Sequence, residues 1–315
     1  MKRFAALITL AFLSPLIAEY LSGSMSLTLI AAMPVMLAMY GGGVILIREL
    51  VRRTGRGWPS ILFLGLAYAL VEEGIADQSL FNPNFMGLHQ LASGYIPALG
   101  IGVSATIFAF GIHVIWSIAV PIALAESLFP SIRNQPWTGR IGLAVAALFY
   151  VAGVALITQY FAKKFVASPA QLAASMTGVA VLTVIGFMLP RVRPKSPGPA
   201  PSPWVAGIVA LITTSAFTQF YGFSLRHGPW QVAAGGMALA LVLLLGFAYG
   251  AARRSGWTPM HTYALAAGAL LTTCWAGFFT SLALHGPATL PAHTVLAATI
   301  IALLVLAGIN VRSAR

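Results

Sequence analysis

Residues 237–247 read MALALVLLLGF and contain no polar side chain. A transmembrane β-strand alternates lipid-facing apolar side chains with polar ones, and this segment does not alternate. A membrane helix instead needs about 20 largely apolar residues in succession. The segment and its apolar flanks therefore predict a helix that crosses a lipid bilayer.

The rest of the chain has the same character. Of its 315 residues, 59% are hydrophobic and 8% are charged, whereas soluble domains carry roughly 25% charged residues. Too few polar side chains remain to cover the surface of a soluble protein. We therefore expect an all-α polytopic membrane protein of about ten transmembrane helices. Breaks at Gly, Pro and Arg place these helices at 4–22, 26–49, 58–76, 98–128, 140–161, 170–189, 203–223, 230–252, 259–284 and 289–311.

The basic residues predict how these spans are oriented. Fifteen of the 18 Lys and Arg residues fall at the termini or in alternate loops, and the other side holds only Lys163, Lys164 and Arg226. Because Lys and Arg are retained in cytoplasmic loops, we expect both termini to be cytoplasmic in a cell membrane, the plasma or inner membrane. The net charge of +12 then faces anionic lipid, which argues against nucleic acid as a partner.

The C-terminal half contains an internal repeat. Pro169, Gln171 and Gly186 have equivalents 60 residues later, and the string His227-Gly228-Pro229 recurs as 285–287. This pattern predicts three tandem helical hairpins of the same orientation within 140–315. We expect two regions, a four-helix region at 1–136 and a six-helix region at 137–315. The simplest role of the six-helix region is a packing scaffold.

All the acidic residues lie in the first region. They are Glu19, Glu49, Glu72, Glu73, Asp77 and Glu126. A carboxylate inside a bilayer is costly unless it is paired, protonated or hydrated, so each one is a functional hypothesis by default. Glu49 and Glu126 lie near cytoplasmic helix ends, where Arg48, Arg52 and Arg53 can neutralise them, and we expect a structural role for both.

Depth places the remaining acidic residues together. At a rise of ~1.5 Å per residue, Glu19 lies ~22 Å along the first helix and Glu72 ~21 Å along the third. His113 comes out ~22 Å from the inner end of the fourth helix. We therefore expect Glu19, Glu72, Glu73 and His113 at one level, in the outer half of the membrane.

Neighbouring side chains extend this candidate site. Asp77 shares a helix face with Glu73, whereas Glu72 points about 100° away, so both glutamates reach one atom only if the helix is distorted. Trp116 and Ser117 lie on the face of His113, where they could stack on a ligand or hold the second imidazole nitrogen.

Two other segments have open interpretations. The connection at 77–97 is either a lid over the site or an interfacial linker. The glycines at 41–43 either unwind their helix or allow a neighbouring helix to approach closely, and we favour close approach. The single cysteine, Cys274, excludes an internal disulfide.

The pair Glu72-Glu73, followed by His113 on the next helix, resembles the intramembrane proteases related to CAAX-processing and bacteriocin-processing enzymes. In this resemblance Asp77 stands where that family has arginine, Ala109 stands where it has phenylalanine, and a His-x3-Asn motif is absent. The resemblance implies a hydrolase with Glu72, Glu73 and His113 as catalytic residues. A glutamate would activate water, and His113 would stabilise an oxyanion or bind a divalent metal.

Two other classes of function fit the same residues. A carboxylate and a histidine at one depth form a possible proton relay, as in a proton-coupled secondary transporter. A buried Glu-His network also serves a membrane scaffold or assembly subunit by specifying how helices pack. For the hydrolase, Glu19, Asp77, Trp116 and Ser117 would contribute to binding a membrane-embedded peptide or lipid substrate.

Overall fold

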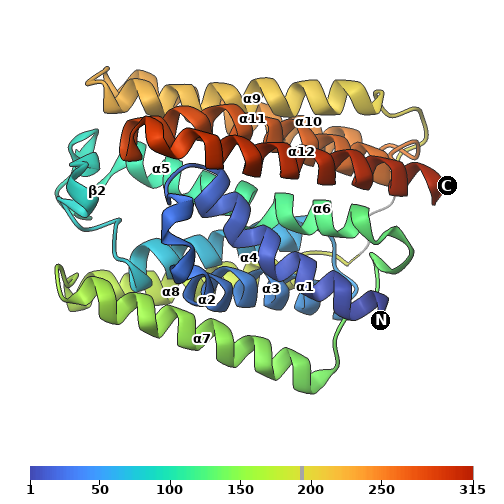
Figure 1. Ribbon diagram of the computed structural model, residues 1–315, viewed down its shortest axis with the longest axis horizontal. Coiled ribbons are helices and arrows are strands. Elements are labelled where there is room, and N and C mark those ends of the chain that lie inside the picture. Colours follow the sequence, from blue (N-terminus) through green and yellow to red (C-terminus); the bar gives the residue numbers. More distant parts are fainter. Residues whose placement is uncertain (192–194, 315) are drawn as a thin grey trace.

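The computed structural model describes residues 1–191 and 195–314, and these form a bundle of long helices that run side by side (Figure 1). Ten helical stretches within the described residues are long and apolar enough to cross a membrane. Their bounds agree with the predicted spans to within a few residues, so the predicted class of fold is confirmed.

Four of these spans contain π-helical turns. They are α1 (Lys2–Pro15) with η1 (Leu16–Leu21); α2 (Met33–Met36), η3 (Leu37–Gly41) and α3 (Gly42–Arg53) after the 3-10 turn η2 (Leu27–Ala32); α4 (Trp58–Val71) with η4 (Glu72–Ala76); and α5 (Val103–Ile112), η7 (His113–Ala119) and α6 (Val120–Leu128). The other six spans are regular: α7 (Arg140–Ala162), α8 (Pro169–Met188), α9 (Pro203–Leu225), α10 (Trp230–Ala252), α11 (Pro259–His285) and α12 (Leu290–Ser313). Two short strands, β1 (Tyr95–Ile96) and β2 (Ile101–Gly102), pair antiparallel in the connection before α5.

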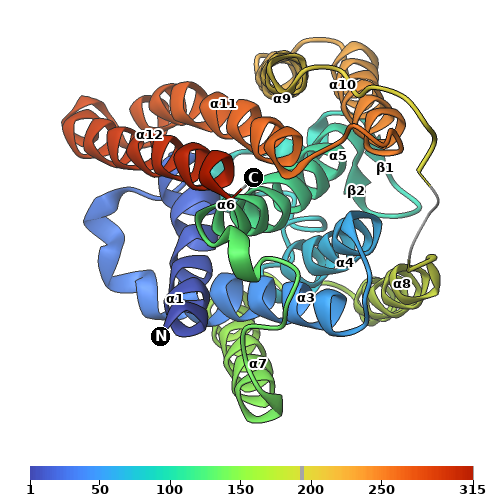
Figure 2. The same cartoon turned by 90° about the vertical axis from the view of Figure 1, so that its right-hand side faces the viewer.

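The span formed by α5, η7 and α6 lies at the centre of the bundle (Figure 2). In its most apolar part 67% of the residues are buried, against 11% for α7 and for α8. Helices α9 to α12 cover one side of this central span, and α1, α3 and α4 cover the other. Polar side chains on the central span are therefore the ones that most need partners within the protein.

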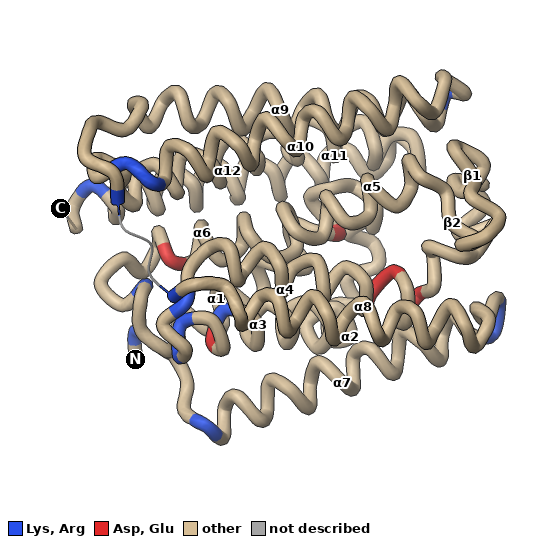
Figure 3. Tube along the Cα trace, turned by 180° about the vertical axis from the view of Figure 1, so that it is seen from behind, with Lys and Arg blue, Asp and Glu red and all other residues tan. Residues whose placement is uncertain are grey.

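Basic residues divide between the two ends of the bundle. Both termini and most of the described Lys and Arg residues lie at one end, which we call the basic end (Figure 3). Lys163, Lys164 and Arg226 follow the opposite ends of α7 and α9, at what we call the far end. Arg193 and Arg315, which the orientation argument counted, lie outside the described residues.

The last six helices form three successive pairs, each joined by a turn at the far end (Figure 1). Helices α9 and α10 pack on each other, and so do α11 and α12. In the first pair α7 instead packs on α3 and η3, while α8 packs on α4, so the two helices stand apart (Figure 2). Threonines line the contact where α9 packs on α11, with the hydroxyls of Thr214 and Thr272 2.7 Å apart.

Glycines let several helices approach closely. A Cβ atom built at Gly41 would lie 2.9 Å from the carbonyl oxygen of Ala11, and one at Gly42 would lie 2.9 Å from the backbone nitrogen of Tyr150. The helix remains continuous through 41–43, which confirms the prediction of close approach. Gly277 of α11 is tighter still, because its Cβ would lie 1.8 Å from the carbonyl oxygen of Leu21 in η1.

We predict that Gly277→Ala destabilises the protein, because the added methyl group forces α11 away from η1; overpacking of this kind costs about 1–3 kcal/mol. Gly246→Ala is the matched control, since a Cβ there meets nothing within 4 Å. Thermal unfolding in lipid nanodiscs, followed by tryptophan fluorescence, should give a lower Tm for Gly277→Ala only. Equal Tm values would contradict the close contact.

Candidate functional site

The π-helical turns of the first four spans each carry a member of one polar cluster. Glu19 lies in η1, Tyr40 in η3, Glu72 and Glu73 in η4, and His113 in η7. A π-helical turn is rare and commonly marks a functional position, because its wider turn redirects side chains at some cost in helix stability. Four such turns around one cluster show that the backbone is shaped to bring these side chains together.

Proline accounts for two of these turns. Pro121 follows η7 and has no N–H to donate to the carbonyl of Ser117, four residues earlier. That carbonyl accepts a hydrogen bond from Ser14 Oγ of α1 at 2.6 Å instead. Pro15 stands directly before η1 and likewise has no N–H to donate to the carbonyl of Ala11, four residues earlier. Each proline thus removes a helical hydrogen bond close to Glu19 or His113. At Ser117, a hydroxyl from a neighbouring span donates to the carbonyl that is left free.

His113 lies between the two adjacent glutamates. Its Nε2 is 2.7 Å from Glu73 Oε1, and its Nδ1 is 3.1 Å from Glu72 Oε2. All three side chains are buried, with exposures of 4% for His113, 5% for Glu72 and 9% for Glu73. The π-helical turn is the distortion that lets adjacent glutamates reach opposite nitrogens of one ring. Ser117 Oγ also lies 3.0 Å from Nδ1 and so positions the imidazole.

Tyr40 extends this contact to Glu19. Its hydroxyl is hydrogen-bonded to both Glu72 Oε1 and Glu19 Oε1, and Glu19 Oε2 accepts from the exposed Ser24 Oγ at 3.0 Å. Glu19 itself is half-buried. The chain of contacts therefore runs from a solvent-exposed hydroxyl to the imidazole in the core.

Beyond Glu73 the contacts continue toward the far end. Ser79 Oγ donates to Glu73 Oε2, and the Ser79 backbone N–H donates to Asp77 Oδ1 at 3.0 Å. Asp77 is half-buried at the end of η4 and touches neither imidazole nitrogen. Burial and then the charge of Glu73 raise the pKa of the Asp77 carboxyl well above its usual range, because both disfavour the ionised form.

We call the six residues Glu19, Tyr40, Glu72, His113, Glu73 and Ser79 the buried network. Five contacts join them in series, and four of these are hydrogen bonds that each need one proton; the contact between Glu72 Oε2 and His113 Nδ1 is not one of them. Tyr40, Ser79 and a neutral imidazole supply three, so four less three leaves one proton. Tyr40 has a single proton for its two contacts, so Glu19 or Glu72 must carry the remaining one, and the three glutamates then have a net charge of −2 rather than −3.

Aromatic rings surround the imidazole. The ring of Tyr68 lies 6.1 Å from that of His113 and stacks on Tyr150 at 5.9 Å. Tyr150 belongs to α7, the peripheral helix, so α7 closes the network from the lipid side. The indole Nε1 of Trp116 donates to the carbonyl of Ala269 at 2.9 Å, which links the central span to α11.

The connection at 77–102 is tied to the rest of the bundle at two places. Gln78 holds a left-handed backbone conformation, with φ of 59°, and its Oε1 accepts from the backbone N–H of Ala167 at 2.6 Å. Further along, Gln90 Oε1 accepts from the hydroxyl of Tyr221 at 2.9 Å. The segment is thereby tied both to the α7–α8 turn and to α9, and it spans the far end of the bundle.

A second polar cluster occupies the basic end. Glu126 accepts from Arg52 at 2.7 Å and from Arg48 at 3.2 Å, and Arg48 also contacts Glu49 at 2.6 Å. Arg48 is fully buried, with its guanidinium 3.4 Å from the ring centre of Trp137. This Arg–Glu cluster joins α3, α6 and the 129–139 loop, and the predicted neutralisation of Glu49 and Glu126 by arginine is confirmed.

Sequence reasoning missed Tyr40 and Ser79. Tyr40 left a signal, since it is a polar group inside an apolar span directly before three glycines, at a depth comparable to that of Glu19. Ser79 left none, because it lies in a connection whose path the sequence does not define. As for a metal, no group of three or more His, Cys, Asp or Glu side chains in the described part of the chain is arranged to hold one.

Comparison with known proteins places the whole chain in a single group. The sequence model described as an uncharacterized membrane protein family matches residues 8–314. No curated protein and no solved structure matches the chain. The match spans all ten helices, and it is consistent with an integral membrane protein.

We predict that Glu126→Gln destabilises the fold, because Arg52 loses its carboxylate partner and Arg48 keeps only Glu49; breaking a buried ion pair costs about 3–5 kcal/mol. Glu72→Gln is the control. Its amide can still accept from Tyr40 and carries no charge to bury, so its Tm should stay near that of the unmodified protein. Thermal unfolding in nanodiscs compares the two variants, and a larger loss for Glu72→Gln would contradict these assignments.

Proposed function

We propose that this chain, which belongs to an uncharacterized membrane protein family, is a proton-coupled transporter that binds its protons on the buried network. The observation that carries the proposal is the series of hydrogen bonds from Ser24 through Glu19 and Tyr40 to Glu72, whose other carboxyl oxygen lies 3.1 Å from His113 Nδ1. Each of these groups can both accept and donate a proton, which is what a relay requires.

The placement of polar clusters supports transport. In this proposal the segment 77–102 closes the far end over the network, and the Arg–Glu cluster closes the basic end. A bundle shut by separate contacts at its two ends corresponds to an occluded state, from which either end can open in turn. In this proposal the spans bend at their π-helical turns, while the hydrogen bonds between neighbouring spans stay in place.

The orientation follows from the charge distribution. We propose that the basic end faces the cytoplasm of a cell membrane, because Lys and Arg gather there with both termini. Glu19 and Ser24 then open toward the outside, where protons enter. A change in protonation alters the charge of the network, and this alters the cost of keeping it buried.

A hydrolase is the second candidate. It is favoured by the 2.7 Å contact between Glu73 and His113, a pair that can orient a carboxylate as a general base. In that case a peptide or lipid substrate would enter from the far end only, after movement of segment 77–102. The basic end would stay closed throughout, which separates the two candidates by experiment.

We predict opposite changes of access at the two ends of the central span. Ser104 and Ser127 are both buried and are conservative positions for cysteine. In a Cys274→Ser background, the Ser104→Cys and Ser127→Cys thiols should react with maleimide at rates that move in opposite directions as pH is lowered, several-fold each. Adding Glu72→Gln, which mimics a protonated carboxyl, should reproduce the low-pH rates at any pH.

A hydrolase and a scaffold predict different results for the same maleimide labelling in nanodiscs. A change at the Ser104→Cys position alone would overturn transport and favour the hydrolase. Equal, slow labelling at every pH would leave the network as a packing device and support a scaffold. Near-UV circular dichroism of each variant verifies that the fold is retained, so a loss of structure is not mistaken for opening.

A further inference from the structure

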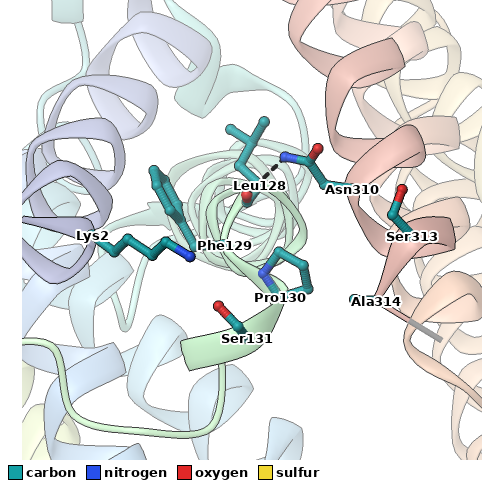
Figure 4. A pocket seen from close by; sticks show the side chains of 8 residues that line it. All are labelled: Lys2, Leu128, Phe129, Pro130, Ser131, Asn310, Ser313 and Ala314. Carbon is teal, nitrogen blue, oxygen red and sulfur yellow. Dashed lines mark hydrogen bonds between the residues drawn. The ribbon is translucent and has the colours of Figure 1, made fainter.

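The basic end carries a hollow between three helix ends, and we propose that it binds the anionic headgroup of a phospholipid. The hollow measures about 390 Å³ and lies where α1 begins and where α6 and α12 end (Figure 4). Its lining comprises Lys2, Leu128, Phe129, Pro130, Ser131, Asn310, Ser313 and Ala314. This inference does not depend on the proposed transport.

Helix packing explains why the hollow exists. Helices α1 and α12 both pack on α6, and α12 meets the first span at η1, toward the far end. Asn310 Nδ2 donates to the carbonyl of Leu128 at 2.9 Å, which ties α12 to the end of α6 and leaves the space beside Lys2 unfilled (Figure 4).

The chemistry of the lining suits an anion. Lys2 contributes a positive charge and Ser131 an exposed hydroxyl donor, Ser313 Oγ donates to the carbonyl of Ile309, and no acidic residue belongs to the lining. Basic pockets between membrane helices at the cytoplasmic surface commonly bind anionic headgroups. A lysine forms strong charge-assisted hydrogen bonds with a phosphate group, and a neighbouring hydroxyl can donate another.

The helices beside the hollow suit acyl chains. Phe4 of α1 is 70% exposed and Ile309 of α12 is 55% exposed, as expected for surfaces in contact with lipid. A phospholipid would place its charged headgroup at the end of these helices and its apolar tails beside them. It therefore fits both the hollow and the exposed apolar surfaces. A free phosphate would satisfy the lining but would gain nothing from the apolar helices.

Native mass spectrometry of the delipidated protein, with phosphatidylglycerol or phosphatidylcholine added, tests the proposal. Lys2→Gln should weaken phosphatidylglycerol binding about fivefold, the effect of one basic residue at a membrane surface. Lys163→Gln, which removes an equal charge at the far end, should leave it unchanged. Ser313→Tyr, which fills the hollow without changing charge, should weaken it too.

Three outcomes would overturn the assignment. Equal losses for Lys2→Gln and Lys163→Gln would mean that only the total charge attracts the lipid. Equal binding of phosphatidylcholine would remove the role of the anionic headgroup. Displacement of phosphatidylglycerol by an equal concentration of inorganic phosphate would assign the hollow to free phosphate rather than to lipid.

Discussion

The contact of His113 with Glu72 and Glu73 is the constraint on which the site depends. Three carboxyl groups inside apolar spans are stable only if protons and hydrogen-bond donors reduce their charge. The buried network meets this requirement through Tyr40, Ser79 and the imidazole. The cost of π-helical turns in four spans is offset because each turn delivers a member of this network.

The Arg–Glu cluster at the basic end stabilises its buried carboxylates in a different way. The Arg–Glu cluster neutralises its carboxylates with permanent positive charge, since arginine stays protonated at any accessible pH. Its charge is therefore fixed, whereas the charge of the buried network changes with each proton bound. The Arg–Glu cluster therefore suits a stable closure, and the buried network suits a switch. The central span of α5, η7 and α6 connects the two through the centre of the bundle.

Much of the fold was predictable from the sequence, because apolar length and breaks at Gly and Pro determine where spans lie. Depth along the helices also placed Glu19, Glu72 and His113 at one level. Which faces meet depends on packing between helices, so the sequence did not indicate the contact of Trp116 with α11, and Tyr40 was missed. The separation of α7 from α8 was equally hidden, because a sequence repeat does not specify which neighbour each helix contacts.

Infrared difference spectroscopy tests the central claim, that the buried network holds one proton beyond those of Tyr40, Ser79 and a neutral imidazole. The Tyr40 hydroxyl has one proton for its contacts with Glu19 and Glu72, so one of these glutamates must be a carboxylic acid at neutral pH. The account predicts a protonated carboxyl band at pH 7 that shifts in D2O, weakens in Glu72→Gln and moves in Tyr40→Phe. A spectrum at pH 7 with ionised carboxylates alone would contradict it.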